Sequence, residues 1–221
     1  MGQEANSANQ QVTNAEGQRF LILIPIIHTP ADMGGLKEPI QRVKVEKLGK
    51  KAWARSKDLV EAYWKRIEET IAGLRLPYER VRLYQDGLPV CGHELQIVAD
   101  MGKLGSRNYR LLLALIAKGA TLMGTESAEL LVEEYQLANQ MVRRPRPQGA
   151  ARGKSEVEAL ADSLLWRRDE FIGRRISSTL EKGETGLIFL GMLHAIGPWL
   201  DADIRVLRPL QPRRGRGGPR P

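Results

Sequence analysis

The sequence is poor in several features, and each shortage excludes a class of protein. Its 221 residues include one cysteine, Cys91, so an internal disulfide and a cysteine-rich zinc site are both excluded. We expect Cys91 itself to be a small buried residue. The longest apolar run, residues 20–27, is far below the roughly 18 residues that a membrane span needs, and Pro25 interrupts it. We therefore expect no membrane partner.

The first residues also lack the marks of an export signal. Residues 1–18 are polar and have neither the charged start, nor the apolar centre, nor the small-residue cleavage site of a secretory peptide. We expect a cytoplasmic protein whose residues 1–18 form a disordered leader. The length suits one domain, which we place at residues 19–207.

The formal charge of +8 suggests a nucleic-acid partner, but ten of the cations lie in two stretches, residues 141–154 and 208–221. Without those ten, 24 of the 34 basic residues remain against 26 acidic ones. Both stretches are rich in proline and glycine, which disfavours packed structure. We predict a flexible basic linker at 143–154 and a disordered basic tail at 208–221. Because few aromatic residues are available to stack on bases, we expect no specific nucleic-acid partner.

Apolar patterning predicts an α/β fold. Continuous apolar runs are typical of strands that are covered on both faces, and they occur at residues 20–27, 81–84, 120–125, 185–193 and 203–207. Apolar residues at steps of three and four predict helices at residues 48–74, 107–118, 127–137 and 155–182. This alternation predicts a single domain with a mostly parallel sheet and helices on both faces.

Ionisable residues directly follow four of the predicted strands: His28, Asp86, Glu126 and His194. In parallel sheets, ligands bind at the carboxyl ends of the strands, so we expect these side chains to share one edge. Such residues can ligate a divalent cation or divide the duties of general acid and base. We predict that His28 and His194 hold a divalent metal ion, with Asp86 and Glu126 as catalytic carboxylates.

Arg168 is a fifth candidate. Apolar residues lie three and four positions before and after it on the predicted helix, so its side chain should point inward. A buried arginine needs a partner, because an unpaired buried charge is costly. It either forms a structural ion pair with Asp86 or Glu126, or stabilises a developing anion as a catalytic residue.

Asp32 either joins the site or shapes a turn. No serine lies in a Gly-x-Ser-x-Gly pattern, which disfavours a serine nucleophile.

Two segments carry a resemblance to a known family. Residues 191–194 read as a GxxH motif on a predicted strand, and Arg168 lies on the helix before it. This order resembles the TraB/Tiki superfamily, whose relatives include erythromycin-esterase-like and ChaN-like proteins. By position, His194 corresponds to the histidine of the second GxxH motif and His28 to the histidine after the first strand, although residues 25–28 lack the motif's glycine.

The resemblance implies one of three activities: metal-dependent peptide hydrolysis, ester hydrolysis with histidine as base, or binding of a cofactor such as haem. We predict a metal-assisted hydrolase that acts on a peptide or ester bond in a peptide or small molecule. The alternative is a non-catalytic module that binds a small ligand or cofactor and recruits a partner through its basic tail. The chain also resembles a group of bacterial proteins without an assigned activity, at residues 28–34 and 83–92.

Overall fold

The computed structural model describes residues 18–29, 50–143 and 156–210. The predicted leader, linker and tail lie outside these ranges apart from their border residues, and Asp32 lies outside them too. Among the described residues, no helix is long and apolar enough to cross a membrane.

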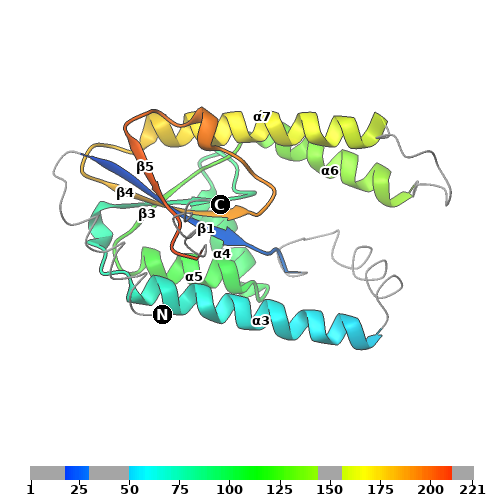
Figure 1. Ribbon diagram of the computed structural model, residues 1–221, viewed down its shortest axis with the longest axis horizontal. Helices are drawn as coiled ribbons and strands as arrows, with labels where there is room; N and C mark the ends of the chain where they lie inside the picture. Colours follow the sequence, from blue (N-terminus) through cyan, green and yellow to red (C-terminus); the bar gives the residue numbers. More distant parts are fainter. Residues whose placement is uncertain (1–17, 30–49, 144–155, 211–221) are drawn as a thin grey trace, which may run out of the picture.

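Five strands form one parallel sheet in the order β3-β2-β4-β1-β5 (Figure 1). The central pair, β1 and β4, is aligned from Phe20 opposite Thr185 to Ile26 opposite Gly191. The predicted fold class is confirmed, and every predicted strand is present. The strands are β1 (Arg19–Ile26), β2 (Val81–Gln85), β3 (Thr121–Met123), β4 (Thr185–Gly191) and β5 (Ile204–Leu207).

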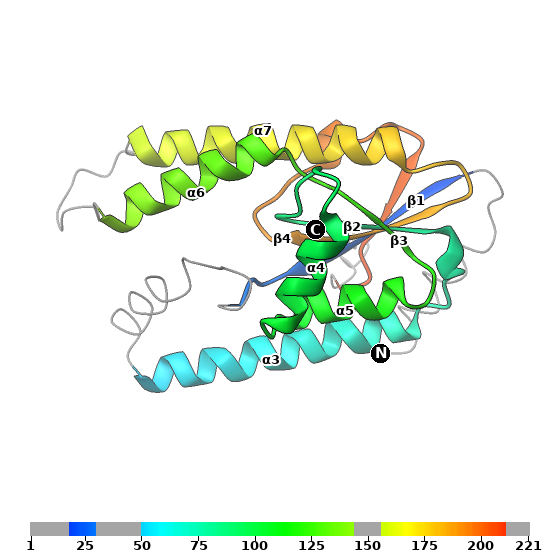
Figure 2. The same ribbon diagram turned by 180° about the vertical axis from the view of Figure 1, so that it is seen from behind.

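Helices cover both faces of the sheet, so the domain has three layers (Figures 1 and 2). One layer holds α3 (Lys50–Gly73), α4 (Glu94–Lys103) and α5 (Arg107–Ile116). The other holds α6 (Ala128–Arg143) and α7 (Glu156–Thr179). Two short 3-10 helices, η3 (Tyr78–Arg80) and η4 (Gly197–Trp199), complete the described elements.

The two covered faces explain why the strands read as unbroken apolar runs. In β1, Ile22 and Ile24 belong to the core beneath α3, α4 and α5. Leu21 lies on the opposite face and belongs to a second core with Ile172 and Ile176 of α7. Successive residues of a strand point to opposite faces, so the central strands are apolar on both faces apart from their first residues, Arg19 and Thr185.

Local signals set the ends of the helices. The Ser127 hydroxyl accepts a hydrogen bond from the Leu130 amide at 3.3 Å, as expected of a residue that caps α6. Gly183 turns the chain from α7 into β4 with a φ of 79°, a conformation that favours glycine.

One expectation is wrong: Cys91 is exposed, because it lies in the loop between β2 and α4 rather than in the core.

The connections between strands diverge at the boundary between β1 and β4. From β1 the chain passes through α3 to β2, whereas from the neighbouring β4 it passes through η4 to β5, in the opposite direction and over the opposite face. A point where neighbouring strands diverge in this way is a topological switch point, and ligands of open parallel sheets bind there. The residues that follow β1 and β4 therefore flank the expected binding crevice.

The contact between α7 and η4 gives a first test. A Cβ atom on Gly173 would lie 3.0 Å from the backbone carbonyl carbon of Trp199, so we expect Gly173→Ala to push η4 away from α7. Overpacking of this kind costs roughly 1–3 kcal/mol of unfolding free energy, to be measured by urea denaturation. Gly197→Ala is the control, because nothing lies within 4 Å of the added atom. Equal stability of the two variants would contradict the close contact.

Candidate active site

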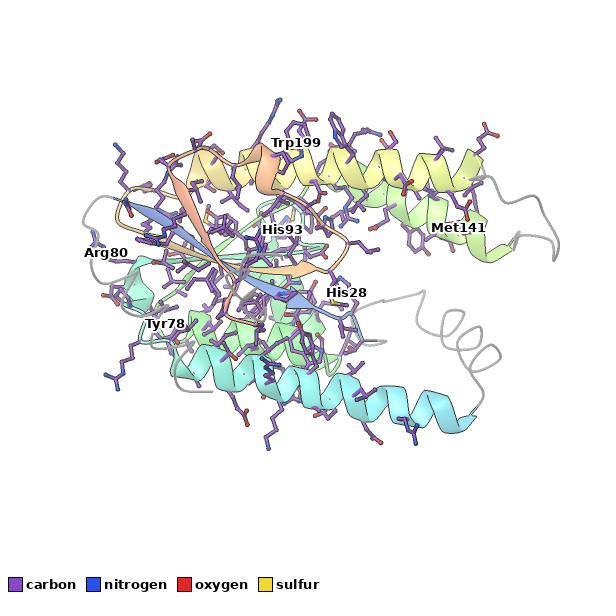
Figure 3. All side chains as sticks on the ribbon, viewed as in Figure 1. His28, Tyr78, Arg80, His93, Met141 and Trp199 are labelled. Atoms are coloured by element: carbon purple, nitrogen blue, oxygen red, sulfur yellow. The ribbon has the colours of Figure 1, made fainter. Side chains whose placement is uncertain are left out.

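The carboxylate of Asp86 is the meeting point of the strand-end residues. Its Oδ2 lies 3.1 Å from Nε2 of His28 and 3.5 Å from Nε2 of His194. The same oxygen accepts the backbone N–H of Gly191 at 2.8 Å. Figure 3 shows His28 at the carboxyl end of β1, and His194 belongs to the loop after β4. The two imidazoles thus lie on either side of the switch point, with Asp86 between them.

Gly191 provides the space for this arrangement. A Cβ atom there would lie 2.7 Å from Asp86 Oδ2, which is shorter than two such atoms tolerate. Without that atom, the carboxylate that follows β2 reaches the backbone of β4 and both imidazoles. The glycine of the GxxH motif is therefore required for a physical reason, the close approach of a neighbouring side chain.

His194 is held from both ends. Its Nδ1 lies 2.5 Å from Oδ1 of Asp169 on α7, and Oδ2 of the same carboxylate accepts the Ala195 amide at 2.8 Å. Burial lowers the pKa of His194, but the hydrogen bonds to Asp169 and Asp86 outweigh it and raise the pKa to about 9. At neutral pH His194 is therefore an imidazolium.

Asp86 is an anion in this environment. Burial alone would raise its pKa, but hydrogen bonds from His194 and His28 hold the pKa well below its ordinary range. One buried carboxylate thus keeps its charge because two imidazoles share it.

Arg168 connects Asp86 to two further carboxylates. Its guanidinium donates to Oδ1 of Asp86 at 2.9 Å and to both oxygens of Glu126 at 2.6 and 2.8 Å, and it also pairs with Glu134 on α6. Glu126 in turn accepts the Gly87 amide at 2.6 Å. Of the two alternatives for Arg168, the geometry favours the structural ion pair, and with both predicted partners at once.

Burial shifts the pKa values of Arg168 and Glu126 in opposite directions, and their ion pair opposes both shifts. Burial lowers the pKa of Arg168, but its ion pairs with Glu126, Glu134 and Asp86 outweigh that effect and raise the pKa. Burial raises the pKa of Glu126, and Arg168 opposes the rise. Arg168 is thus a fixed cation that keeps Asp86 in place, rather than a group free to receive a ligand.

Asp169 was missed by the sequence analysis. It follows Arg168 directly, and one helical step of about 100° turns it toward His194 instead of Asp86. The available signal was a second ionisable residue beside Arg168 on a helix with apolar neighbours, since a buried charged pair of this kind needs partners. The sequence does not indicate which strand-end residue pairs with Arg168 and which with Asp169.

The side chains as they stand fit a hydrogen-bonded cluster better than a metal centre. Within residues 18–29, 50–143 and 156–210, no group of three or more histidine, cysteine, aspartate or glutamate side chains could hold a metal ion. Asp86 Oδ2, the atom that both imidazoles face, already accepts an amide hydrogen bond. Metal ligation by His28 and His194 stays a prediction, and two histidines alone leave a site short of the usual three or four protein ligands.

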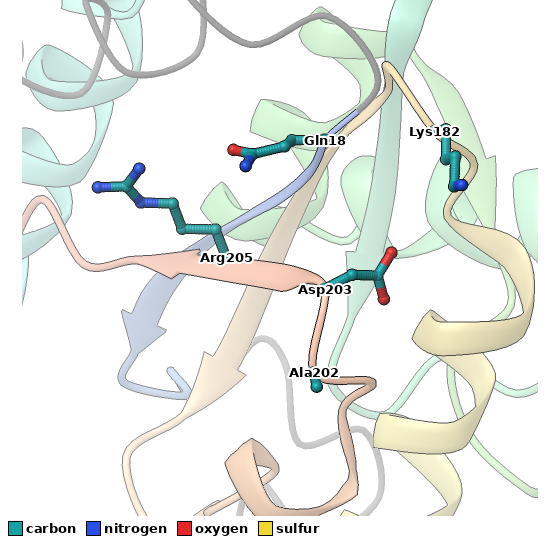
Figure 4. A pocket seen from close by; sticks show the side chains of 5 residues that line it. All are labelled: Gln18, Lys182, Ala202, Asp203 and Arg205. Carbon is teal, nitrogen blue, oxygen red and sulfur yellow. The ribbon is translucent and has the colours of Figure 1, made fainter.

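A groove of about 690 Å³ lies in the α3–α5 layer, and none of the predicted site residues lines it. It runs between α3 and α5 and reaches Thr29, the residue after His28. A second hollow of about 410 Å³ lies at the amino ends of the strands and contains none of the predicted site residues; its lining is Gln18, Lys182, Ala202, Asp203 and Arg205 (Figure 4). The first hollow comes nearer in sequence to the site, because it is lined by Thr29, the residue after His28.

The topology and the cluster define an α/β protein with a histidine–carboxylate centre at its switch point. Comparison of the chain with family models, with curated proteins and with solved structures finds no match. The resemblance to the TraB/Tiki superfamily therefore rests on the motif residues alone.

Two neighbouring arginines test the buried network. Arg168→Met removes the cation of Glu126 and leaves Asp86 with its imidazole contacts alone, and breaking such a buried pair costs about 3–5 kcal/mol of unfolding free energy. Arg167→Met is the control, because Arg167 forms an exposed pair with Glu133 and should change stability little. Chemical denaturation of both variants measures the difference. Similar losses in both would mean that the buried network is not a stabilising constraint.

The titration of His194 gives a second test. The chain has three histidines, so NMR can follow each imidazole, and we expect one midpoint near pH 9 that Asp169→Asn lowers. Since the folded-state pKa lies above the ordinary 6.5, the stability gained from this charge is complete below pH 6.5 and is lost as pH rises through about 9. The unfolding free energies of wild type and Asp169→Asn should therefore converge toward high pH. A His194 midpoint that Asp169→Asn leaves unchanged would contradict the pairing.

Proposed function

We propose that the protein is a hydrolase in which His28 and His194 divide the acid and base work of cleaving an ester or peptide bond. The observation that carries this proposal is a pair of imidazoles, each against a carboxylate, that meet at Asp86 beside the switch point. Two such groups with different surroundings can hold different protonation states at one pH, which acid–base catalysis requires.

His28 has the role of general base. Its side chain is 36 % exposed, whereas that of His194 is 5 % exposed, so water reaches His28 more easily. The hydrogen bond to Asp86 orients its ring and stabilises the imidazolium that forms when His28 takes a proton from the attacking water. The water oxygen then bonds to the carbonyl carbon of the substrate.

His194 has the role of electrophile and general acid. Its Nδ1 is fixed by Asp169, and the contact of its Nε2 with Asp86 is the weaker of the two, 3.5 Å long. A substrate carbonyl oxygen that replaces this weaker contact can accept the hydrogen bond from Nε2 as negative charge develops on the oxygen. When the tetrahedral intermediate collapses, the bond to the leaving group breaks and the leaving atom receives a proton from His194.

One feature also supports a metal-assisted variant of the same hydrolase. A carboxylate behind Nδ1 of a histidine, as Asp169 is behind His194, is common where Nε2 ligates a metal. This is the version that the resemblance to the TraB/Tiki superfamily implies. It requires the two imidazoles to turn from Asp86 Oδ2 toward a shared cation, and the experiment below separates the two versions.

The test is hydrolysis by purified protein of nitrophenyl esters and fluorogenic peptides, with metal content measured on the same sample. We expect His28→Gln and His194→Gln each to lower kcat at least about 100-fold, the usual contribution of a general acid or base. His93→Gln is the matched control, because this third histidine is exposed at the start of α4 and should leave kcat unchanged.

The outcomes discriminate among the candidates. Activity that survives chelation supports the acid–base version, whereas activity lost on chelation and restored by a divalent cation supports the metal-assisted one. Full activity in both glutamine variants would refute the proposal. Ligand binding without any hydrolysis would favour the non-catalytic module.

A further inference from the structure

Four large apolar side chains lie on or against the segment from β4 to η4 that carries His194. Met192 and Leu193, between Gly191 and His194, are 64 % and 83 % exposed. Trp166 on α7 is 54 % exposed and meets Trp199 of η4 edge to face, with the ring centroids 4.9 Å apart. We call these four residues, Met192, Leu193, Trp166 and Trp199, the apolar rim.

The apolar rim is carried by the elements that also hold His194, namely α7 and the loop from β4 to η4. On α7, Trp166 lies three residues before Asp169, the partner of His194, and Gly173 lies four residues after Asp169, where it packs against Trp199. Figure 3 shows Trp199 over α7. The loop that leaves β4 thus presents Met192 and Leu193 immediately before His194, and it ends on the tryptophan pair.

Each charged side chain of the site already has a partner within the protein. Arg168 is paired with three carboxylates, Asp86 accepts from an amide and faces two imidazoles, and Asp169 holds His194. A charged group on a substrate would have to displace one of these contacts. Exposed apolar side chains, in contrast, gain roughly 25 cal/mol for each Å² that a ligand removes from water. The binding energy available beside His194 is therefore mainly apolar.

We infer that the apolar rim binds an apolar group of the substrate, an alkyl chain or a ring next to the bond that is cleaved. This inference rests on the proposed hydrolase and names its substrate class: hydrophobic esters or amides rather than short, charged ones. The apolar group would lie along the loop between β4 and η4, so that the carbonyl carbon faces the imidazoles.

The first experiment measures binding without turnover. Octanoate and butyrate serve as product-like probes in titration calorimetry with the full chain. We expect wild type to bind octanoate more tightly than butyrate, and Leu193→Ser to weaken octanoate binding roughly tenfold, since burial of one leucine is worth at least that factor. Leu104→Ser is the matched control, because Leu104 is 71 % exposed at the end of α4, in the other helical layer.

The second experiment uses nitrophenyl acetate and nitrophenyl octanoate. In wild type kcat/KM should rise with chain length; Leu193→Ser should abolish that rise, and Leu104→Ser should retain it. Octanoate binding that depends on Leu193 without any hydrolysis would support the apolar rim and refute the hydrolase. The inference is overturned if Leu193→Ser leaves octanoate affinity intact, if Leu104→Ser weakens it equally, or if Leu193→Ser converts a dimer to a monomer in sedimentation.

Discussion

The buried ion pairs of Arg168 are the constraint on which the centre of the molecule depends. Taking a guanidinium and the carboxylates of Asp86 and Glu126 out of water is costly, and their short mutual hydrogen bonds offset that cost. One side chain of α7 is thereby tied to the residues that follow β2 and β3. Asp86, fixed in this way by its Oδ1, presents Oδ2 to both imidazoles. The geometry of the candidate active site is thus a consequence of where Arg168 can find partners.

The topology of the sheet gives the two histidines different surroundings, which the ion pairs of Arg168 alone would not do. Because β1 and β4 are neighbours with diverging connections, the His28 side chain is 36 % exposed, whereas His194 is turned against α7 and is 5 % exposed. One imidazole is therefore accessible and the other is enclosed between two carboxylates. The two imidazoles therefore share Asp86 but stand in different surroundings.

Much of the fold could be predicted because its causes are local. The unbroken apolar run of β1 predicts a strand covered on both faces, and parallel strands bring His28, Asp86, Glu126 and His194 to one edge whatever the details of packing. The partner choices could not be predicted, because they depend on helix rotation and on the length of each loop. Arg168 could have met Asp86 or Glu126 and meets both, while the neighbouring residue Asp169, one step around the helix, takes His194.

The missing side chain of Gly191 has a further consequence for how this sequence can vary. The carboxylate that follows β2 occupies the volume in which a Cβ atom of β4 would lie. Positions 86 and 191 therefore divide a fixed space, so a larger residue at 191 is compatible only with a shorter one at 86. Shortening residue 86 would remove the anion that both imidazoles face. The two positions can change only together, because a change in either one alone breaks the contacts among Asp86, Gly191 and the two imidazoles.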